Sequence, residues 1–202
     1  MCRSCKKYLI YNKIECQNYL RRSIFKGVVK KMNININKNL SQMKKYSEIY
    51  LFVFLNAFLI LCDQIVKLII ENNMNLHDSF AALGFLRITY VQNYGAAFSI
   101  LSGQKIVLIV ITLLIISFLI AFFIKKQIKD LLYIVSIVMV TAGGIGNLID
   151  RIFRGYVVDY FDIKIWPFDD FAIFNFADCL VVVGAIIFAI KFIISEFFHT
   201  KT

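Results

Sequence analysis

The chain has 202 residues, of which 59% are hydrophobic and 18% are charged, and 23 basic against 13 acidic residues give a net charge of +10. Its mean hydropathy is +0.71. Soluble domains are about half apolar and a quarter charged, so this composition indicates a membrane protein. It excludes a disordered chain, a coiled coil and an ordinary nucleic-acid-binding domain.

The positive charge is concentrated at the N-terminus, where 12 of the 23 basic residues precede Ser47. Residues 1–42 are rich in Asn and Lys, show no sustained apolar face and lack the apolar core of a secretory signal. We therefore expect a dispensable basic tail over residues 1–42, or a translation start at Met43, followed by one domain over residues 43–202. Because the charge belongs to this tail, we expect no nucleic-acid partner.

The five cysteines give no sign of a metal site. Their number is odd, and the pair formed by Cys2 and Cys5 has no second pair with which to complete a zinc site. We expect neither a disulfide framework nor a bound metal, and we expect no cofactor.

Four apolar segments predict helices over residues 49–70, 106–124, 131–149 and 173–194. Nineteen helical residues reach about 28 Å, which is close to the hydrocarbon thickness of a bilayer. The segments lack the two-residue alternation of barrel strands, so helices are the structure that satisfies their backbone in lipid. The predicted fold is an all-α membrane protein with four transmembrane helices.

Two longer segments connect these helices on one side of the membrane. Residues 86–91 alternate in polarity and predict a small β-type element on the membrane surface. The second segment, residues 151–170, contains Trp166, which is typical of a membrane interface. The short loop over residues 125–130 carries three lysines and is predicted to be cytoplasmic, which places both termini in the cytoplasm and the two longer segments outside.

Polar residues within the apolar segments are the main functional signal, because ionisable groups in a membrane are rare. They are expected to meet at one depth in the outer half of the bilayer. The set comprises Asp63, Lys67, Asn147, Asp150, Asp159, Asn175 and Asp178.

Two aspartates that lie close together in a low dielectric share one proton, and such a pair can hydrolyse a peptide bond. An ion or proton pathway would use the same carboxylates, and Asp63 and Lys67 could simply neutralise each other as a structural pair. The residues alone leave these alternatives open.

Four sequence motifs together resemble lipoprotein signal peptidase, also called signal peptidase II. They are Asp-Gln-Ile-Val-Lys at 63–67, Asn-Tyr-Gly-Ala-Ala-Phe at 93–98, Gly-Asn-Leu-Ile-Asp-Arg at 146–151 with Gly-Tyr-Val-Val-Asp-Tyr at 155–160, and Phe-Asn-Phe-Ala-Asp at 174–178. The motifs follow the order and spacing of the family over residues 44–195. Tyr160 is a departure, because the family usually has Phe at that position.

The resemblance implies an aspartyl endopeptidase that removes the signal peptide from diacylglyceryl-modified bacterial prolipoproteins and cuts before the lipidated cysteine. It implies that Asp159 and Asp178 are catalytic. It also implies a substrate-binding or supporting role for Asp63, Lys67, Asn93, Gly95, Asn147, Asp150, Arg151 and Asn175.

The expected partners are therefore prolipoproteins and membrane lipid, and the enzyme is expected to act as a monomer in the bacterial cytoplasmic (inner) membrane with its active site toward the outer face. The alternative is a transporter subunit with a proton relay, but a relay would need acids through the whole membrane depth. A structural scaffold would leave the buried acids unexplained.

Overall fold

The computed structural model describes residues 13–95, 101–126, 128, 130–164 and 172–199. Within these residues lie four helices: α1 (Lys13–Asn73), α2 (Lys105–Lys126), α3 (Leu131–Phe153) and α4 (Phe176–His199). By length and composition, each contains a segment able to cross a membrane, namely Tyr46–Asn73, Lys105–Lys125, Leu131–Phe153 and Phe176–Ser195. The predicted fold class is confirmed, and the chain is a multi-pass membrane protein.

The chain divides into two units, Met1–Leu51 and Phe52–Thr202. In the first unit, α1 is already helical from Lys13, and every side chain from Arg21 to Leu40 is exposed. The chain's single proline is Pro167, so nothing in this stretch interrupts the helical hydrogen bonds. Whether residues 1–42 are dispensable stays a prediction, and the Cys2–Cys5 pair lies outside the described residues.

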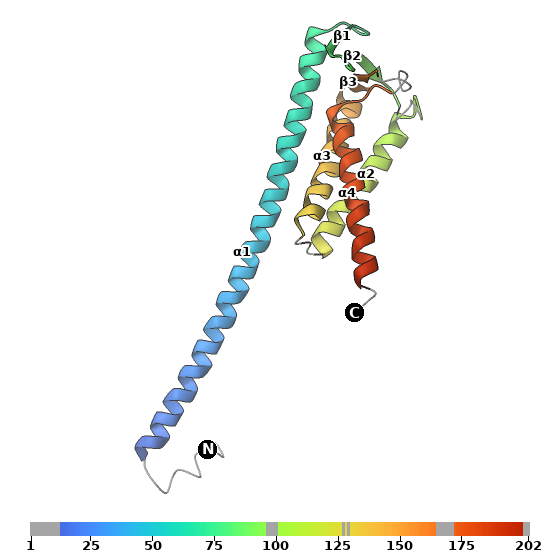
Figure 1. Ribbon diagram of the computed structural model, residues 1–202. Coiled ribbons are helices and arrows are strands. Elements are labelled where there is room, and N and C mark those ends of the chain that lie inside the picture. Colours follow the sequence, from blue (N-terminus) through green and yellow to red (C-terminus); the bar gives the residue numbers. More distant parts are fainter. Residues whose placement is uncertain (1–12, 96–100, 127, 129, 165–171, 200–202) are drawn as a thin grey trace. The chain divides into compact units, whose positions relative to one another are not determined.

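A three-stranded antiparallel sheet belongs to the second unit and lies at one end of α2, α3 and α4 (Figure 1). Its strands are β1 (Ser79–Leu83), β2 (Leu86–Asn93) and β3 (Val157–Ile163), in the order β1-β2-β3. Strand β2 contains the predicted strand over residues 86–91. The sequence did not predict β3, which lies in the segment expected to be a loop.

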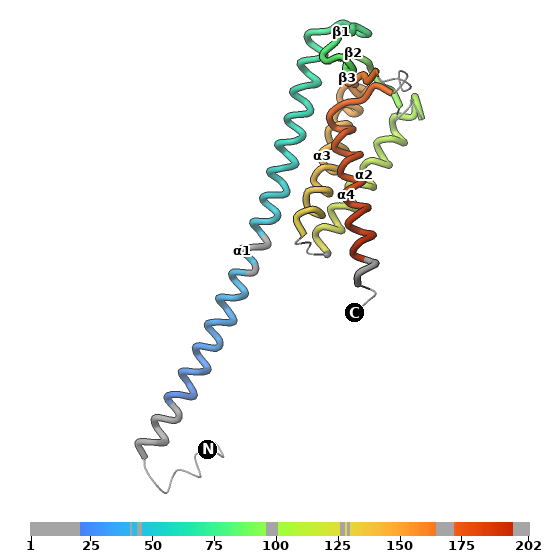
Figure 2. The backbone as a smooth tube through the Cα atoms, viewed as in Figure 1, coloured from blue at the N-terminus to red at the C-terminus, as the bar shows by residue number. Residues whose placement is uncertain are grey.

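The burial of β3 explains why its sequence is apolar on both sides of Asp159. Its residues Val158 and Tyr160 form a small core with Tyr90 of β2, and both are at most 1% exposed. The apolar run around Asp159 is therefore a buried strand that lies between β2 and the start of α4 (Figure 2). Trp166, predicted to lie at the membrane interface, is outside the described residues.

The helix boundaries differ from the predicted ones where polar side chains find partners. Asp130 caps the N-terminus of α3 by accepting from the backbone N–H of Leu132 at 2.9 Å. Helix α3 continues to Phe153, four residues beyond the predicted end, because the polar residues near its C-terminus make internal contacts. Helix α4 begins at Phe176 rather than 173, because Phe174 is extended and pairs with Phe161 of β3.

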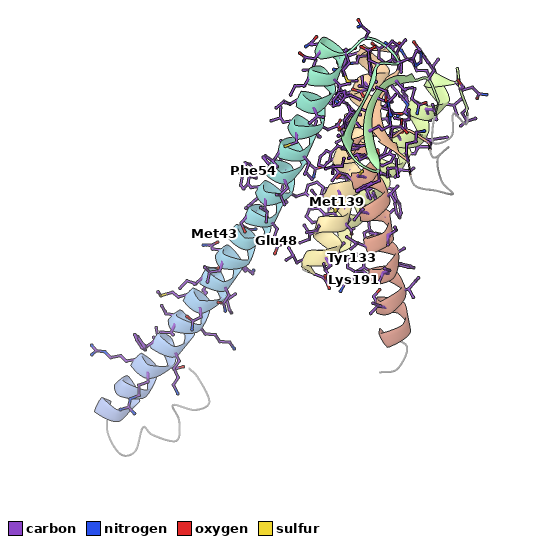
Figure 3. The ribbon with its side chains drawn as sticks, turned by 45° about the horizontal axis from the view of Figure 1, so that its top comes forward. Met43, Glu48, Phe54, Tyr133, Met139 and Lys191 are labelled. Atoms are coloured by element: carbon purple, nitrogen blue, oxygen red, sulfur yellow. The ribbon has the colours of Figure 1, made fainter. Side chains whose placement is uncertain are left out.

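Helices α3 and α4 approach closely through small residues. A Cβ atom at Gly143 of α3 would meet the backbone oxygen of Ala177, and one at Gly184 of α4 would lie 2.9 Å from the Cβ of Met139. At the other end of the two helices, Tyr133 and Lys191 lie near each other (Figure 3). There Lys191 forms an ion pair of 2.6 Å with Asp130. The pair of helices is therefore fixed along its length, and α3 holds its polar residues against α4.

Candidate active site

Lys67 is the centre of a buried polar cluster between α1 and α3. Its side chain is fully buried, and its Nζ lies 2.9 Å from Oδ2 of Asp63 and 2.8 Å from Oδ2 of Asp150. The third ammonium hydrogen is donated to Oδ1 of Asn147 at 2.9 Å. A lysine ammonium has three donors, so Lys67 is fully satisfied by groups from two helices.

Asp150 is bound from several directions. Besides Lys67, its carboxylate accepts from Nη1 of Arg154, from Nε2 of Gln64 at 3.1 Å and from the backbone N–H of Val158 at 3.3 Å. The last contact ties the start of β3 to the end of α3. Asp63 makes a similar link to α4, because its Oδ1 accepts from the backbone N–H of Ala177 at 3.1 Å. The cluster therefore fixes the strand and the helix that carry the other two aspartates.

Asp159 projects from β3 and is 2% exposed. Its Oδ1 accepts from Nδ2 of Asn175 at 2.7 Å, and its Oδ2 accepts from Nδ2 of Asn93 at 2.9 Å. Burial, together with the nearby charge of Asp178, raises the pKa of Asp159 to about 7. A carboxyl group with this pKa can hold or release a proton near neutral pH.

Asp178 lies in the first turn of α4, where it forms a capping box with Asn175. Oδ1 of Asn175 accepts from the backbone N–H of Asp178 at 2.9 Å, and Oδ2 of Asp178 accepts from the backbone N–H of Asn175 at 3.1 Å. The other carboxylate oxygen accepts from Nδ2 of Asn147 at 2.7 Å. The positive end of the α4 dipole favours negative charge at this position.

Each of the three asparagines has its amide orientation fixed by a group that can only donate. The amide oxygen of Asn147 accepts from the ammonium of Lys67. The amide oxygen of Asn175 accepts from the backbone N–H of Asp178, and the amide oxygen of Asn93 accepts from the backbone N–H of Gly95 at 2.8 Å. Each NH₂ group must then point the other way. As a result, all three amides donate to the carboxylates of Asp159 and Asp178.

Arg151 borders this group on the α3 side. Its Nη2 donates to the backbone oxygen of Gly95 at 2.9 Å, and its Nη1 donates to the backbone oxygen of Asn147 at 3.4 Å. Arg151 therefore holds the end of the β2 segment beside the two aspartates. Residues 96–98, which complete the second motif, lie outside the described residues.

The structure thus brings together every side chain that the sequence singled out for the site. Sequence reasoning missed Gln64, Glu71 and Arg154. Arg154 donates to Oε2 of Glu71 at 2.9 Å and to Oε1 of Gln64 at 3.0 Å. Sequence spacing could have indicated two of them. Gln64 lies next to Asp63, and Arg154 follows Asp150 by one helical turn, so each lies near a residue already assigned to the site.

Fold and site together define a class: a multi-pass membrane protein in which two aspartates, on a strand and a helix end, share one hydrogen-bonded cluster, as in a membrane aspartic peptidase. The sequence model of the family described as Signal peptidase (SPase) II matches residues 55–194. The chain belongs to the signal peptidase II family.

Individual relatives agree with this assignment. The lipoprotein signal peptidase of Halothermothrix orenii is 45% identical over 127 residues, which are 62% of this chain and 83% of the relative. That of Staphylococcus aureus is 41% identical over 139 residues, or 68% of this chain and 85% of the relative. A solved structure described as a bacterial membrane enzyme aligns with a TM-score of 0.68 at 38% identity and covers 72% of this chain and 88% of that one.

Proposed function

We propose that this protein removes the signal peptide from diacylglyceryl-modified bacterial prolipoproteins and that Asp159 and Asp178 carry out the hydrolysis. The observation that carries the proposal is the position of Asn175 between them. Its Nδ2 donates to Asp159 at 2.7 Å, and its backbone N–H donates to Asp178 at 3.1 Å. One residue thus holds the two carboxyl groups in a shared arrangement, as an aspartyl dyad requires.

The surroundings of the two aspartates support different protonation states. We assign the shared proton to Asp159, whose pKa is raised to about 7 by burial and by Asp178. Asp178 lies in the first turn of α4, at the positive end of the helix dipole, which is the feature that Asp159 lacks. Asp178 is then the base, and Asp159 is the acid.

In the proposed reaction, Asp178 takes a proton from a water molecule, whose oxygen bonds to the carbonyl carbon of the scissile peptide. Asp159 gives its proton to the carbonyl oxygen, which forms a neutral tetrahedral intermediate. When the C–N bond breaks, the nitrogen leaves with the proton held by Asp178. One hydroxyl of the intermediate returns a proton to Asp159, so both groups regain their initial states.

Asn93, Gly95 and Arg151 are proposed to bind substrate or support its binding. The backbone oxygen of Gly95 is bound to Arg151, and the backbone N–H of Gly95 is bound to Asn93. This chain of contacts leads from the end of β2 to Asp159. An extended peptide entering beside β2 would meet amide and guanidinium donors suited to its carbonyl oxygens or to a lipid ester.

We further propose that the enzyme works as a monomer in the bacterial cytoplasmic membrane, with both termini in the cytoplasm and the site toward the outer face. The support is the lysine-rich loop over residues 125–130, which favours a cytoplasmic position. The partners proposed here are the prolipoprotein and the surrounding lipid.

The test is a gel-shift cleavage assay with a diacylglyceryl-modified prolipoprotein and the purified protein in detergent. Asp159→Asn and Asp178→Asn should each abolish cleavage while thermal unfolding shows a folded protein. Asp162→Asn is the matched control, because Asp162 is also buried in β3 but accepts from Thr89 at 2.9 Å rather than from the site's asparagines. Normal cleavage by either site variant, or an uncut precursor with the wild-type protein, would contradict the proposal.

A further inference from the structure

The N-terminal segment of α1, residues 21–40, exposes an unusual number of apolar side chains. Phe25 is 69% exposed and Met32 is 57% exposed. The exposed apolar residues of the segment are Ile24, Phe25, Val28, Val29, Met32, Ile34, Ile36 and Leu40. A water-exposed helix does not keep such a surface uncovered without a reason. This segment also precedes the region matched by the family, which begins at residue 55, so the proposed function does not account for it.

These apolar residues are not scattered around the helix. At about 100° per residue, all except Ile34 fall within a sector of about 160°. Lys26, Lys30, Lys31 and Lys38 fall within the remaining sector, whereas Arg21, Arg22, Asn35 and Asn39 fall within the apolar one. The helix therefore gathers most of its apolar residues on one side, but Arg21, Asn35 and Asn39 interrupt that side, and the expectation of no sustained apolar face stays a prediction.

The charge of the segment has one sign. Six basic residues lie in it, namely Arg21, Arg22, Lys26, Lys30, Lys31 and Lys38, and the sequence has no acidic residue between Gln17 and Ser47. Two copies of this helix would therefore bring lysines together without acidic partners, which disfavours self-association. An anionic surface would match the charge, and an apolar layer beneath it would match the opposite face.

We propose that residues 21–40 form an interfacial helix that binds anionic phospholipid headgroups through its lysines and inserts its apolar face into the membrane surface. A basic polar face opposite an apolar face is the pattern of helices that lie in the headgroup region. The segment is also continuous in the chain with the first membrane span, which begins at Tyr46. Because α1 is helical without a break from Lys13 to Asn73, the proposal requires that α1 bends between Leu40 and Tyr46 when the segment lies on the membrane surface.

The proposal is tested with the full-length protein in nanodiscs that hold one molecule each. An environment-sensitive fluorophore is attached to single cysteines introduced at Phe25, Val29 or Met32, or at Lys26 or Lys30, in a background in which the native cysteines are serine. In discs with 30% phosphatidylglycerol, the first three positions should give blue-shifted emission and the two lysine positions should not. In phosphatidylcholine alone or in 0.5 M salt, the shift should decrease.

A charge variant separates lipid binding from simple helix formation. Lys26→Glu/Lys30→Glu/Lys31→Glu should abolish the blue shift at Val29, whereas the matched change of the same residues to Arg should preserve it. Equal emission at all five positions, or a shift that the Glu variant or phosphatidylcholine leaves intact, would overturn the proposal. A shift that appears only in discs holding two molecules would instead identify a second copy as the occupant. Because no readout uses cleavage, failure here leaves the proposed peptidase function untouched.

Discussion

Nζ of Lys67 lies 2.9 Å from Oδ1 of Asn147, and the amide nitrogen of the same asparagine lies 2.7 Å from Oδ1 of Asp178. A fully buried cation is thus connected to a proposed catalytic carboxylate through a single side chain. Because the ammonium can only donate, it forces Asn147 to present its NH₂ group to Asp178. The charged cluster of α1 and α3 therefore has a direct effect on the reaction site on α4.

Replacing Asn147 with Asp should reduce cleavage without unfolding the protein. The new carboxylate keeps the contact with Lys67, but it removes the donor to Asp178 and places a like charge beside it. Loss of one hydrogen bond to a charged group is worth about 1.5–3 kcal/mol, which corresponds to a fall of about 10- to 100-fold in kcat. The fall is measured in the cleavage assay, with Asn73→Asp, at the exposed end of α1, as the matched control. Unchanged kcat in Asn147→Asp would show that the link has no catalytic role.

Replacing Lys67 with Met should strongly destabilise the fold, since Asp63 and Asp150 would then be buried without their shared cation. Removing one partner of a buried ion pair typically costs about 3–5 kcal/mol. The thermal unfolding temperature in detergent should fall accordingly. Adding Asp63→Asn and Asp150→Asn should recover much of the loss, because both uncompensated charges are removed. If the triple variant is no more stable than Lys67→Met, the loss comes from packing rather than from charge.

The rate of cleavage should fall as the pH rises through about 7. Asp159 acts as the acid, and its pKa is raised to about 7 by burial and by Asp178, so higher pH removes the required proton. The hydrogen bond from Asn93 favours the ionised form and lowers this pKa. Asn93→Ala should therefore raise the pKa of Asp159 and move the falling limb of kcat/KM to higher pH. Gln92→Ala is the control, and a limb that moves to lower pH in Asn93→Ala would contradict the assignment.

Alanine should be tolerated at Gly144 but not at Gly143 or Gly146. A Cβ at Gly146 would lie 2.5 Å from Oδ2 of Asp63, and one at Gly143 would meet the backbone oxygen of Ala177. At Gly144 the nearest atom, 3.3 Å away, is the end of the flexible Ile116 side chain. Overpacking of this kind costs about 1–3 kcal/mol. Gly144→Ala should therefore have the highest thermal unfolding temperature of the three single variants. The prediction is wrong if Gly144→Ala is the least stable.

Much of the fold could be predicted from the sequence because the membrane simplifies it. An apolar segment of about twenty residues in lipid has to be a helix, and the four segments were visible as such. Strand β3 was not predicted, because Asp159 and Asp162 interrupt its apolar pattern. Those acids are buried by contacts from Asn93, Asn175 and Thr89, which come from distant parts of the chain.

The site residues could be predicted as a group, because charged side chains in apolar segments need partners. Their pairing could not be. The sequence suggested that Asp63 and Lys67 neutralise each other, and the structure adds Asp150 as a second carboxylate on the same ammonium. Likewise, the orientation of Asn147 depends on Lys67, which is 80 positions away in the chain. Such contacts follow from helix packing and are not encoded in local spacing.

Two of the ion pairs described above join residues of the same helix, one turn apart: Asp63 with Lys67 in α1, and Asp150 with Arg154 at the end of α3. During biosynthesis, helices enter the bilayer before they have all met, and a lone charge within a membrane helix is costly, by up to about 2.5–3.5 kcal/mol at the centre and less toward the ends. An acid and a base on adjacent turns can neutralise each other within one helix. Each segment therefore brings its own counter-ion into the membrane, and Lys67 needs only to gain Asp150 when α1 and α3 assemble.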